Sequence, residues 1–307
     1  HSASLNVKRS VIAMNSAECT TVMVDPGTGV MLRTVRWGNA PDATLAPLVL
    51  VHGLASNAML WEGAALEFAA LGHAVVAVDL RGHGLSEKPD DGYDMQTVTF
   101  DLAKLLEVLA VRGFVRPVVC GQSWGGNVVI ELAHQYPQQV RGVVAVDGGF
   151  LELQNHFPEW EACSIALRPP NLLGTSVKNM REYMQRAHSD WPQTGIDGAM
   201  ANMEHLPDGT VRPWLTLDRH LKVLRGLWEH KPTHLYNDIK VPVLFVPAEG
   251  PGGVFAETKR HAVEQALSMV PVVRVEWFSP ADHDLHAQHP ERFAQVVHKA
   301  TKDGFFA

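Results

Sequence analysis

The sequence lacks a long hydrophobic run: no stretch of its 307 residues approaches the roughly 20 apolar residues that a membrane-spanning helix requires. Cysteine is scarce, and Cys19, Cys120 and Cys163 show no paired spacing. They fit isolated thiols in a reducing compartment better than a disulfide framework or a zinc site. Basic residues form no stripe and the net charge is -7, which does not favour nucleic-acid binding. We expect a cytoplasmic protein without a membrane or nucleic-acid partner.

Cofactor motifs are missing as well. The sequence contains no metal-ligand spacing and no phosphate-cradling loop. Residues 250–253 are rich in glycine, but they do not stand between a strand and a helix in the way that a dinucleotide-binding fold requires. The sequence therefore predicts no metal and no organic cofactor.

What is present is an ordinary globular composition, with 46% hydrophobic and 19% charged residues. The length suits one large domain, or a core with an insertion. Residues 1–13 contain no apolar stretch of the signal-peptide type. They fit either a flexible arm or a segment placed ahead of a natural start at Met14.

Short apolar runs alternate with helical patterns through most of the chain. Runs that are apolar along their whole length indicate a parallel sheet covered on both faces. The turn residues 25–29 predict that the first two strands form an antiparallel hairpin. The sequence thus predicts an α/β fold, with a mostly parallel, doubly wound sheet and an antiparallel N-terminal hairpin. We expect strands over 20–24, 30–37, 47–51, 74–78, 118–120, 140–146, 241–246 and 272–277, and helices over 59–71, 95–109, 257–269 and 290–299.

The alternation stops between residues 148 and 237, where proline, tryptophan and methionine are frequent and helical patterns are short, as over 177–187 and 217–228. We expect residues 1–147 and 238–307 to form the core, and residues 148–237 to form a helical cap over the carboxyl edge of the sheet. A second packing layer without a substrate role is the alternative. Tryptophan and methionine line adaptable apolar sites but also fill cores. The candidate substrate-binding residues are Trp160, Trp191, Trp214 and Met184.

The motif Gly121-Gln122-Ser123-Trp124-Gly125 stands directly between an apolar strand pattern and a helix pattern. In that setting G-x-S-x-G is typical of a nucleophile elbow, in which the glycines allow a sharp turn and the serine hydroxyl is exposed at the sheet edge. Ser123 is therefore the candidate nucleophile. A chance Gly/Ser turn is the alternative.

A serine hydroxyl needs a base, which is usually a histidine oriented by a carboxylate. Among 16 histidines, His283 follows the last predicted strand and precedes the last helix, where a loop can present it to the elbow. His286 and His289 are alternatives on the same segment. Developing negative charge also needs two backbone N–H donors, which we expect from Trp124 and from Leu54 after His52-Gly53. A plain strand-ending turn is the alternative for the latter, and a structural role is expected for His52.

These motifs resemble the α/β-hydrolase superfamily, in the serine-nucleophile branch with a cap insertion. The resemblance rests on residues 48–53, 79–86, 121–126 and 282–283, followed by Pro290-Glu291-Arg292-Phe293. It implies that a triad acid follows the strand over 241–246, yet Pro251 stands about where that aspartate is expected. Some members place the acid after the preceding strand, which points to Asp147. Glu249 is the alternative acid.

The predicted activity is that of a serine hydrolase acting through an acyl-enzyme on an ester, lactone or related carbonyl bond of a small, largely apolar substrate. A carboxylic ester hydrolase or a lactonase fits best. A C–C bond hydrolase, a thioesterase and an acyltransferase remain open. An alternative of another class is a ligand-binding receptor of the same fold with little turnover. We expect a monomer or a homodimer.

Overall fold

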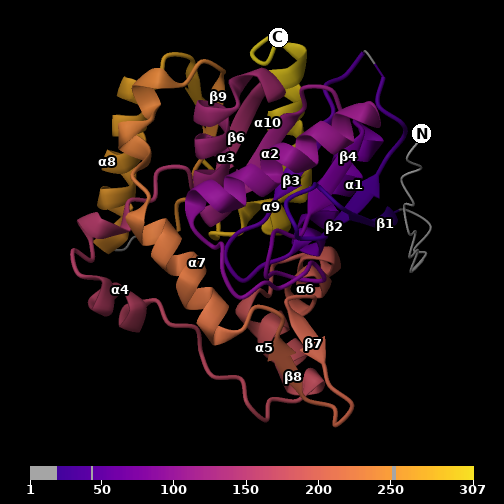
Figure 1. Ribbon diagram of the computed structural model, residues 1–307, viewed down its shortest axis with the longest axis vertical. Coiled ribbons are helices and arrows are strands. Elements are labelled where there is room, and N and C mark those ends of the chain that lie inside the picture. Colours follow the sequence, from indigo (N-terminus) through magenta and orange to yellow (C-terminus); the bar gives the residue numbers. More distant parts are fainter. Residues whose placement is uncertain (1–18, 43, 251–253) are drawn as a thin grey trace, which may run out of the picture.

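The computed structural model describes residues 19–42, 44–250 and 254–307, and the possible arm over residues 1–13 lies outside them. An eight-stranded sheet with the order β1-β2-β4-β3-β5-β6-β9-β10 forms the centre of the molecule (Figure 1). The strands are β1 (Cys19–Val24), β2 (Leu32–Trp37), β3 (Leu48–Val51), β4 (Val75–Val78), β5 (Val118–Gln122), β6 (Gly142–Val146), β9 (Val243–Val246) and β10 (Val273–Val275).

The sheet is parallel from β4 to β10, while β1 and β2 pair antiparallel with each other and β2 pairs antiparallel with β4. The hairpin turn uses Gly27 and Gly29 at positive φ, and the Asp25 carboxylate accepts a hydrogen bond from the Gly27 N–H at 2.8 Å. The predicted mostly parallel sheet with an antiparallel N-terminal hairpin is confirmed.

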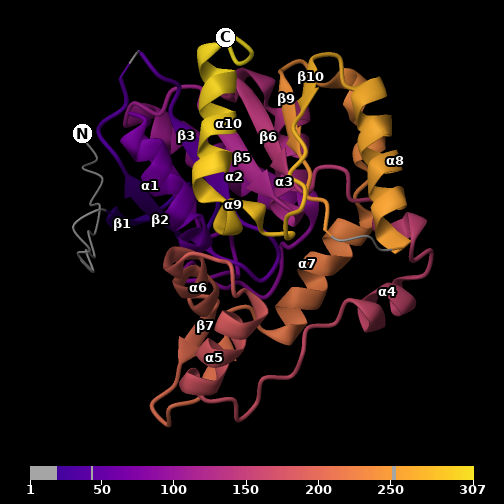
Figure 2. The ribbon, with the colours of Figure 1, turned by 180° about the vertical axis from the view of Figure 1, so that it is seen from behind.

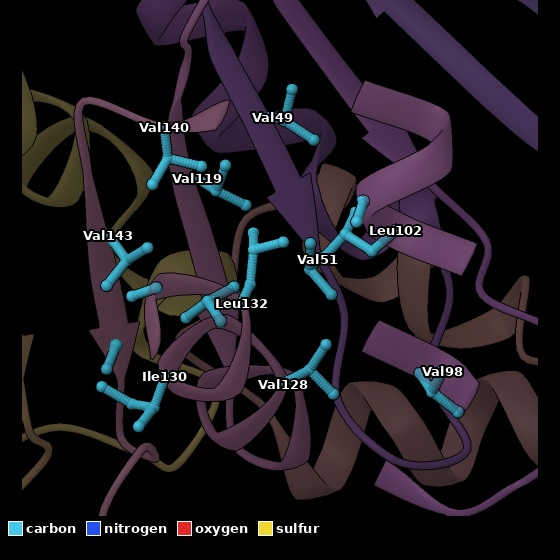
Figure 3. Close-up of a cluster of buried hydrophobic side chains, with 14 of the residues drawn as sticks. Val49, Val51, Val98, Leu102, Val119, Val128, Ile130, Leu132, Val140 and Val143 are labelled. Atoms are coloured by element: carbon cyan, nitrogen blue, oxygen red, sulfur yellow. The ribbon is translucent and has the colours of Figure 1, made fainter. Parts of the chain in front are cut away.

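Helices cover both faces of the sheet, as a doubly wound arrangement requires. The helices α1 (Glu62–Ala70) and α10 (Pro290–Lys302) pack on one face, and α2 (Met95–Val111), α3 (Trp124–Gln135) and α8 (Val254–Met269) pack on the other (Figures 1 and 2). Figure 3 shows part of the hydrophobic core on the face covered by α2, α3 and α8. Valines of β3, β5 and β6 pack there against Val98 and Leu102 of α2 and Leu132 of α3. None of the described helices is long and apolar enough to cross a membrane.

Residues 148–237 run between β6 and β9 and are called the insertion here. Figure 1 shows most of the insertion below the sheet, beyond the ends of the central strands. It contains α4 (Trp160–Ala166), α5 (Val177–Ala187), α6 (Gln193–Met200), the two-stranded hairpin of β7 (Met203–His205) and β8 (Val211–Pro213), α7 (Leu217–Glu229) and short 3₁₀ turns at Leu153–Asn155, Pro232–His234 and Tyr236–Asp238.

The hairpin and the helices α4 and α6 were not predicted. The sequence of α6 contains two glycines and has weak helix propensity. Tertiary contact forms it instead, because α6 lies directly on the turn at Ala58–Trp61: a Cβ on Gly198 would stand 2.7 Å from the Leu60 Cα. The Asn57 amide adds hydrogen bonds to the Gly198 carbonyl and to Asn202.

Two buried ion pairs fix the loops at this edge of the sheet. Asp79 accepts hydrogen bonds from Arg33, from the Ala58 N–H and from the Leu85 N–H. Arg81 holds Asp101 of α2 through two parallel hydrogen bonds of 2.5 and 2.9 Å, and both side chains are buried. Removing one partner of such a pair leaves an uncompensated buried charge.

Replacing Arg81 with methionine is expected to lower the free energy of unfolding by about 3–5 kcal/mol, because the Asp101 carboxylate loses its partner. Urea denaturation followed by circular dichroism measures the loss. Lys104→Met is the control, since it breaks the exposed pair of Lys104 with Glu107 on the same helix and should cost less than about 1 kcal/mol. Equal losses in the two variants would contradict the assignment of Arg81 to the buried framework.

Candidate active site

Ser123 occupies a sharp turn between β5 and α3. Its backbone has φ 55° and ψ −120°, a conformation that costs a residue with a side chain about 1–3 kcal/mol. The turn is held because the Ser123 N–H donates to the Val146 carbonyl at 2.8 Å and the Ser123 carbonyl accepts from the Gly126 N–H at 2.8 Å. The side chain stays partly exposed in a turn whose neighbours are buried.

Gly125 permits the close approach of α3 to the loop after β3. A Cβ at this position would stand 2.4 Å from the His52 carbonyl oxygen, which a folded chain does not tolerate. A Cβ on Gly53 would likewise stand 3.2 Å from the Ser123 Cβ. The loop that follows β3 and the serine turn are therefore in direct contact, as an oxyanion site requires.

Leu54 and Trp124 flank this contact. Trp124 is the first residue of α3, so its N–H belongs to the helix terminus that has no intrahelical acceptor. The side chain of Trp124 is buried and stacks on His83 with 5.2 Å between ring centroids, which fixes the start of the helix. Leu54 is partly buried and follows directly on Gly53.

His52 has structural partners on both ring nitrogens. Its Nε2 accepts a hydrogen bond from the Leu80 N–H at 2.9 Å, and its Nδ1 lies 2.7 Å from the Gly53 carbonyl oxygen. This pattern fits a neutral ring that donates from Nδ1. Burial lowers the pKa of His52, in agreement with a neutral ring that holds the loop.

His283 and Asp147 meet across the carboxyl edge of the sheet. The His283 Nδ1 lies 2.5 Å from the Asp147 Oδ2, and the Asp147 side chain is 1% exposed whereas that of His283 is 52% exposed. Asp147 follows β6 with φ 40°, and its Oδ1 accepts from the Ala248 N–H at 2.9 Å. The arrangement buries the carboxylate and leaves the imidazole accessible.

The two groups stabilise each other's charged forms. The surrounding protein disfavours a charged ring and on its own would lower the pKa of His283, but the hydrogen bond and negative charge of Asp147 outweigh this, so the pKa of His283 is raised. Burial on its own would raise the pKa of Asp147, but the hydrogen bonds and positive charges of His283 and Lys259 outweigh it, so this pKa is lowered.

Glu249, the alternative acid, has a different partner. Its carboxylate forms an ion pair with Arg260 of α8, and its backbone N–H donates to the Phe278 carbonyl. No contact between Glu249 and His283 is found among the described residues. Pro251, which the sequence places near the usual position of the acid, lies outside the described residues.

The two alternative histidines, His286 and His289, contact other aromatic side chains. His286 is buried in the short helix α9 (Leu285–Gln288), packs on Trp61 with 4.1 Å between ring centroids, and has a pKa lowered by burial to about 3. His289 lies beside Phe278 at the start of α10. Of the three histidines on this segment, the described contacts bring His283 to the buried aspartate.

The insertion contacts the His283 loop through Trp191. The indole Nε1 of Trp191 donates to the Asp282 carboxylate at 2.9 Å. Gln288 completes the link, because its Nε2 donates to Asp190 at 2.6 Å and its Oε1 accepts from the Asp282 N–H at 2.6 Å. Two adjacent residues of the insertion thus hold the segment that carries His283.

The other candidate substrate-binding residues do not gather beside Trp191. Trp160 packs against Trp228 and lines a cavity of about 530 Å³ between α4, α7 and the loop that precedes α2. Trp214 lines a different cavity of about 480 Å³ together with Met59 and Met203. The candidate substrate-binding residues therefore lie at separate places in the insertion.

Met184 packs between two small apolar clusters, one with Trp191 and one with Met180. Two residues at the site were not predicted, Lys259 on α8 and Gln122, whose Nε2 donates to the His283 carbonyl at 3.2 Å. Gln122 stands inside the elbow motif, but no sequence pattern distinguishes Lys259 from other helix-surface lysines. Within the described ranges, no group of three histidine, cysteine, aspartate or glutamate side chains is arranged to hold a metal ion.

Comparison with known proteins agrees with this geometry. Residues 48–296 match the profile of the alpha/beta hydrolase family, and the chain belongs to that family. The chain is similar to 2-(acetamidomethylene)succinate hydrolase of Mesorhizobium japonicum, with 28% identity over 259 residues that cover 82% of this chain and 87% of that protein. A shorter match, 36% identical over 126 residues, covers 41% of this chain and 43% of a non-heme chloroperoxidase of Streptomyces lividans.

The crystal structure of E-2-(acetamidomethylene)succinate hydrolase is also similar, with a TM-score of 0.75 and 25% identity. The match covers 93% of this chain and 100% of that chain, so it includes the insertion as well as the sheet. A thioesterase domain from a curacin biosynthetic pathway shares the fold, with a TM-score of 0.71 and 17% identity.

Replacing Trp191 with phenylalanine removes the hydrogen bond to Asp282 and keeps an aromatic ring against His188, which stacks on Trp191 at 3.9 Å. For a reaction in which His283 is the base, as the sequence predicts, we expect kcat/KM to fall by about 3- to 10-fold, mainly through kcat, because a small displacement of a reacting group slows the chemical step. Steady-state kinetics measure the change.

Trp228→Phe is the matched control for that variant. The Trp228 Nε1 donates to the Phe157 carbonyl within the insertion, away from the His283 loop. The control should keep its activity within about twofold, the spread expected for loss of one distant hydrogen bond. Equal losses in both variants would show that Trp191 acts through the stability of the insertion alone.

Proposed function

We propose that this protein is a serine hydrolase in which Ser123 is the nucleophile, His283 the general base and Asp147 the carboxylate that orients the base. The proposal rests chiefly on the 2.5 Å contact between the His283 Nδ1 and the Asp147 Oδ2 at the sheet edge that carries the strained Ser123 turn. Membership of the alpha/beta hydrolase family supports it independently.

In the proposed reaction, the His283 Nε2 takes the Ser123 proton as the serine oxygen attacks a substrate carbonyl carbon. The N–H groups of Leu54 and Trp124 stabilise the negative charge on the carbonyl oxygen. The protonated His283 then gives its proton to the leaving group, and an acyl-serine remains. Water, deprotonated by His283, attacks the acyl carbon, and the protonated His283 then gives the proton to the departing serine oxygen, which releases the acid and restores the free serine.

Asp147 holds the imidazole with its Nδ1 proton directed at the carboxylate, which leaves the Nε2 lone pair for the serine. The same interaction raises the pKa of His283, so the base is protonated and inactive at low pH. We therefore propose that kcat/KM falls as the pH decreases, and that the midpoint of this fall lies above about pH 6.5, the ordinary pKa of histidine.

A carboxylic ester or a lactone of a small molecule remains the proposed substrate, with the insertion as its cap. Thioester hydrolysis, C–C bond hydrolysis and acyl transfer would use the same three residues, and the panel described below includes thioesters. The similarity to 2-(acetamidomethylene)succinate hydrolase over 82% of the chain favours a second candidate, hydrolysis of an N-acyl bond in a substrate with carboxylates. A ligand-binding receptor would bind such compounds without turnover.

Kinetics of two carboxylate variants test the assignment of the acid. Asp147→Asn is expected to lower kcat/KM by about 10²–10⁴-fold, because the neutral amide does not stabilise the imidazolium and no longer fixes the tautomer with its proton on Nδ1. Glu249→Gln should remain within about threefold, since its partner is Arg260. A p-nitrophenyl ester series, lactones, thioesters and N-acyl enamine dicarboxylates form the substrate panel.

Ser123→Ala provides the reference for that series and should lose at least about 10³-fold in kcat/KM. A crippled Glu249→Gln beside an active Asp147→Asn would overturn the choice of Asp147. Undiminished activity of Ser123→Ala on every substrate would overturn the serine mechanism. Tight binding of panel compounds without turnover would favour the receptor.

A further inference from the structure

The Asp147 carboxylate has a second cationic partner besides His283. Lys259, in the first half of α8, places its Nζ 2.8 Å from the Asp147 Oδ1 and 3.0 Å from the Asp147 Oδ2. The same ammonium donates to the Ala248 carbonyl at 2.9 Å. All three donors of the lysine therefore have an acceptor, and its side chain is 29% exposed.

The contacts of Lys259 link the ends of two neighbouring strands. Asp147 follows β6 and Ala248 follows β9, and the Ala248 N–H itself donates to the Asp147 Oδ1. With the bond to His283, the carboxylate accepts hydrogen bonds from three different segments. Lys259 is the donor among them that contributes an ammonium group.

Acidic groups dominate the remaining surroundings of His283. Asp282 and Asp284 flank it on its own loop, and Asp147 faces it from β6. The nearby basic groups are Lys259 of α8, His188 of the insertion, which lies 3.9 Å from the Asp282 carboxylate, and His286 of α9. Because the pKa of His286 is lowered to about 3 by burial, that ring is neutral and does not offset the carboxylates.

We propose that Lys259 is a positioning residue for the reaction, which fixes the Asp147 carboxylate against His283 and offsets part of the carboxylate's charge. This inference rests on the proposed function, because it assigns Lys259 a role through the Asp147–His283 pair. The aspartate alone would orient the base and at the same time favour its protonated form. The lysine preserves the orientation and weakens the second effect.

Electrostatics sets the direction of the expected effect. A positive charge in contact with Asp147 reduces the attraction between the carboxylate and an imidazolium, and Lys259 accordingly acts to lower the pKa of His283. Loss of the lysine charge should raise the pKa of His283. The acidic limb of activity should move to higher pH by at least about half a pH unit, given the short distances and partial burial.

The rate of inactivation by a fluorophosphonate probe, measured from pH 5 to 9, tests the inference without knowledge of the natural substrate. The variants are Lys259→Gln and Lys259→Met, which remove the charge, and Lys259→Arg, which keeps it. We expect the acidic limb to shift upward in the first two and to coincide with that of the unmodified protein in Lys259→Arg. Two neutral variants are used so that one that fails to fold does not end the test.

Arg260→Gln is the matched control. Arg260 is the next residue of α8, carries the same charge and pairs with a carboxylate, but that carboxylate is Glu249. Its side chain is 60% exposed, so its charge is screened, and the limb should not move. A purely structural role of Lys259 would lower the plateau rate and leave the limb in place.

The outcomes separate the inference from the proposed function. If the unmodified protein is not labelled, or Ser123→Ala is labelled equally, the proposed function fails. If labelling requires Ser123 and the limbs of Lys259→Gln and Lys259→Met match that of the unmodified protein, the function stands and the inference is overturned. A shift of equal size in Arg260→Gln would also overturn it, because the effect would then be one of net charge.

Discussion

The site depends on the hydrogen bonds of the buried Asp147 carboxylate, because residues from separate parts of the chain bind to it. Asp147 follows β6, accepts a hydrogen bond from the N–H of Ala248 after β9, binds the ammonium of Lys259 on α8 and pairs with the Nδ1 of His283 on the loop after β10. Its side chain is 1% exposed, so the carboxylate itself is shielded from water although His283 and Lys259 are partly exposed. Loss of the carboxylate would leave the lysine, the histidine and the β9 terminus without their common partner.

The register of the sheet places Ser123 and Asp147 relative to each other. Ser123 and Asp147 follow directly on Gln122 and Val146, which are partners in the β5–β6 register. Both residues have positive φ, so the chain turns sharply after each of the two strands at the same edge of the sheet. Neighbouring strands hold both turns, since the Ser123 N–H donates to Val146 and the Asp147 N–H donates to the Val246 carbonyl. The ladder that forms the core therefore also sets the distance between the two polar residues.

Much of the fold could be predicted from the sequence, because the core strands are uniformly apolar and the elbow motif stands between a strand and a helix. The choice between Asp147 and Glu249 could not, since both follow neighbouring strands and sequence does not show which carboxylate reaches the imidazole. In the structure the two carboxylates have different partners on α8: Lys259 binds Asp147, and the adjacent Arg260 binds Glu249. The insertion was the least predictable part, because contacts such as that of α6 with the Ala58–Trp61 turn determine its short elements.

The central claim is that Asp147 orients His283 and sets its proton affinity. An NMR titration of the protein with ¹⁵N-labelled histidine tests it most directly, with the His283 signal identified by its absence in His283→Gln. The account predicts a pKa above about 6.5 for His283 in the unmodified protein and in Glu249→Gln, and a lower pKa in Asp147→Asn, where the surrounding protein still disfavours the charged ring. A His283 pKa that is unchanged in Asp147→Asn, or that falls only in Glu249→Gln, would contradict the account.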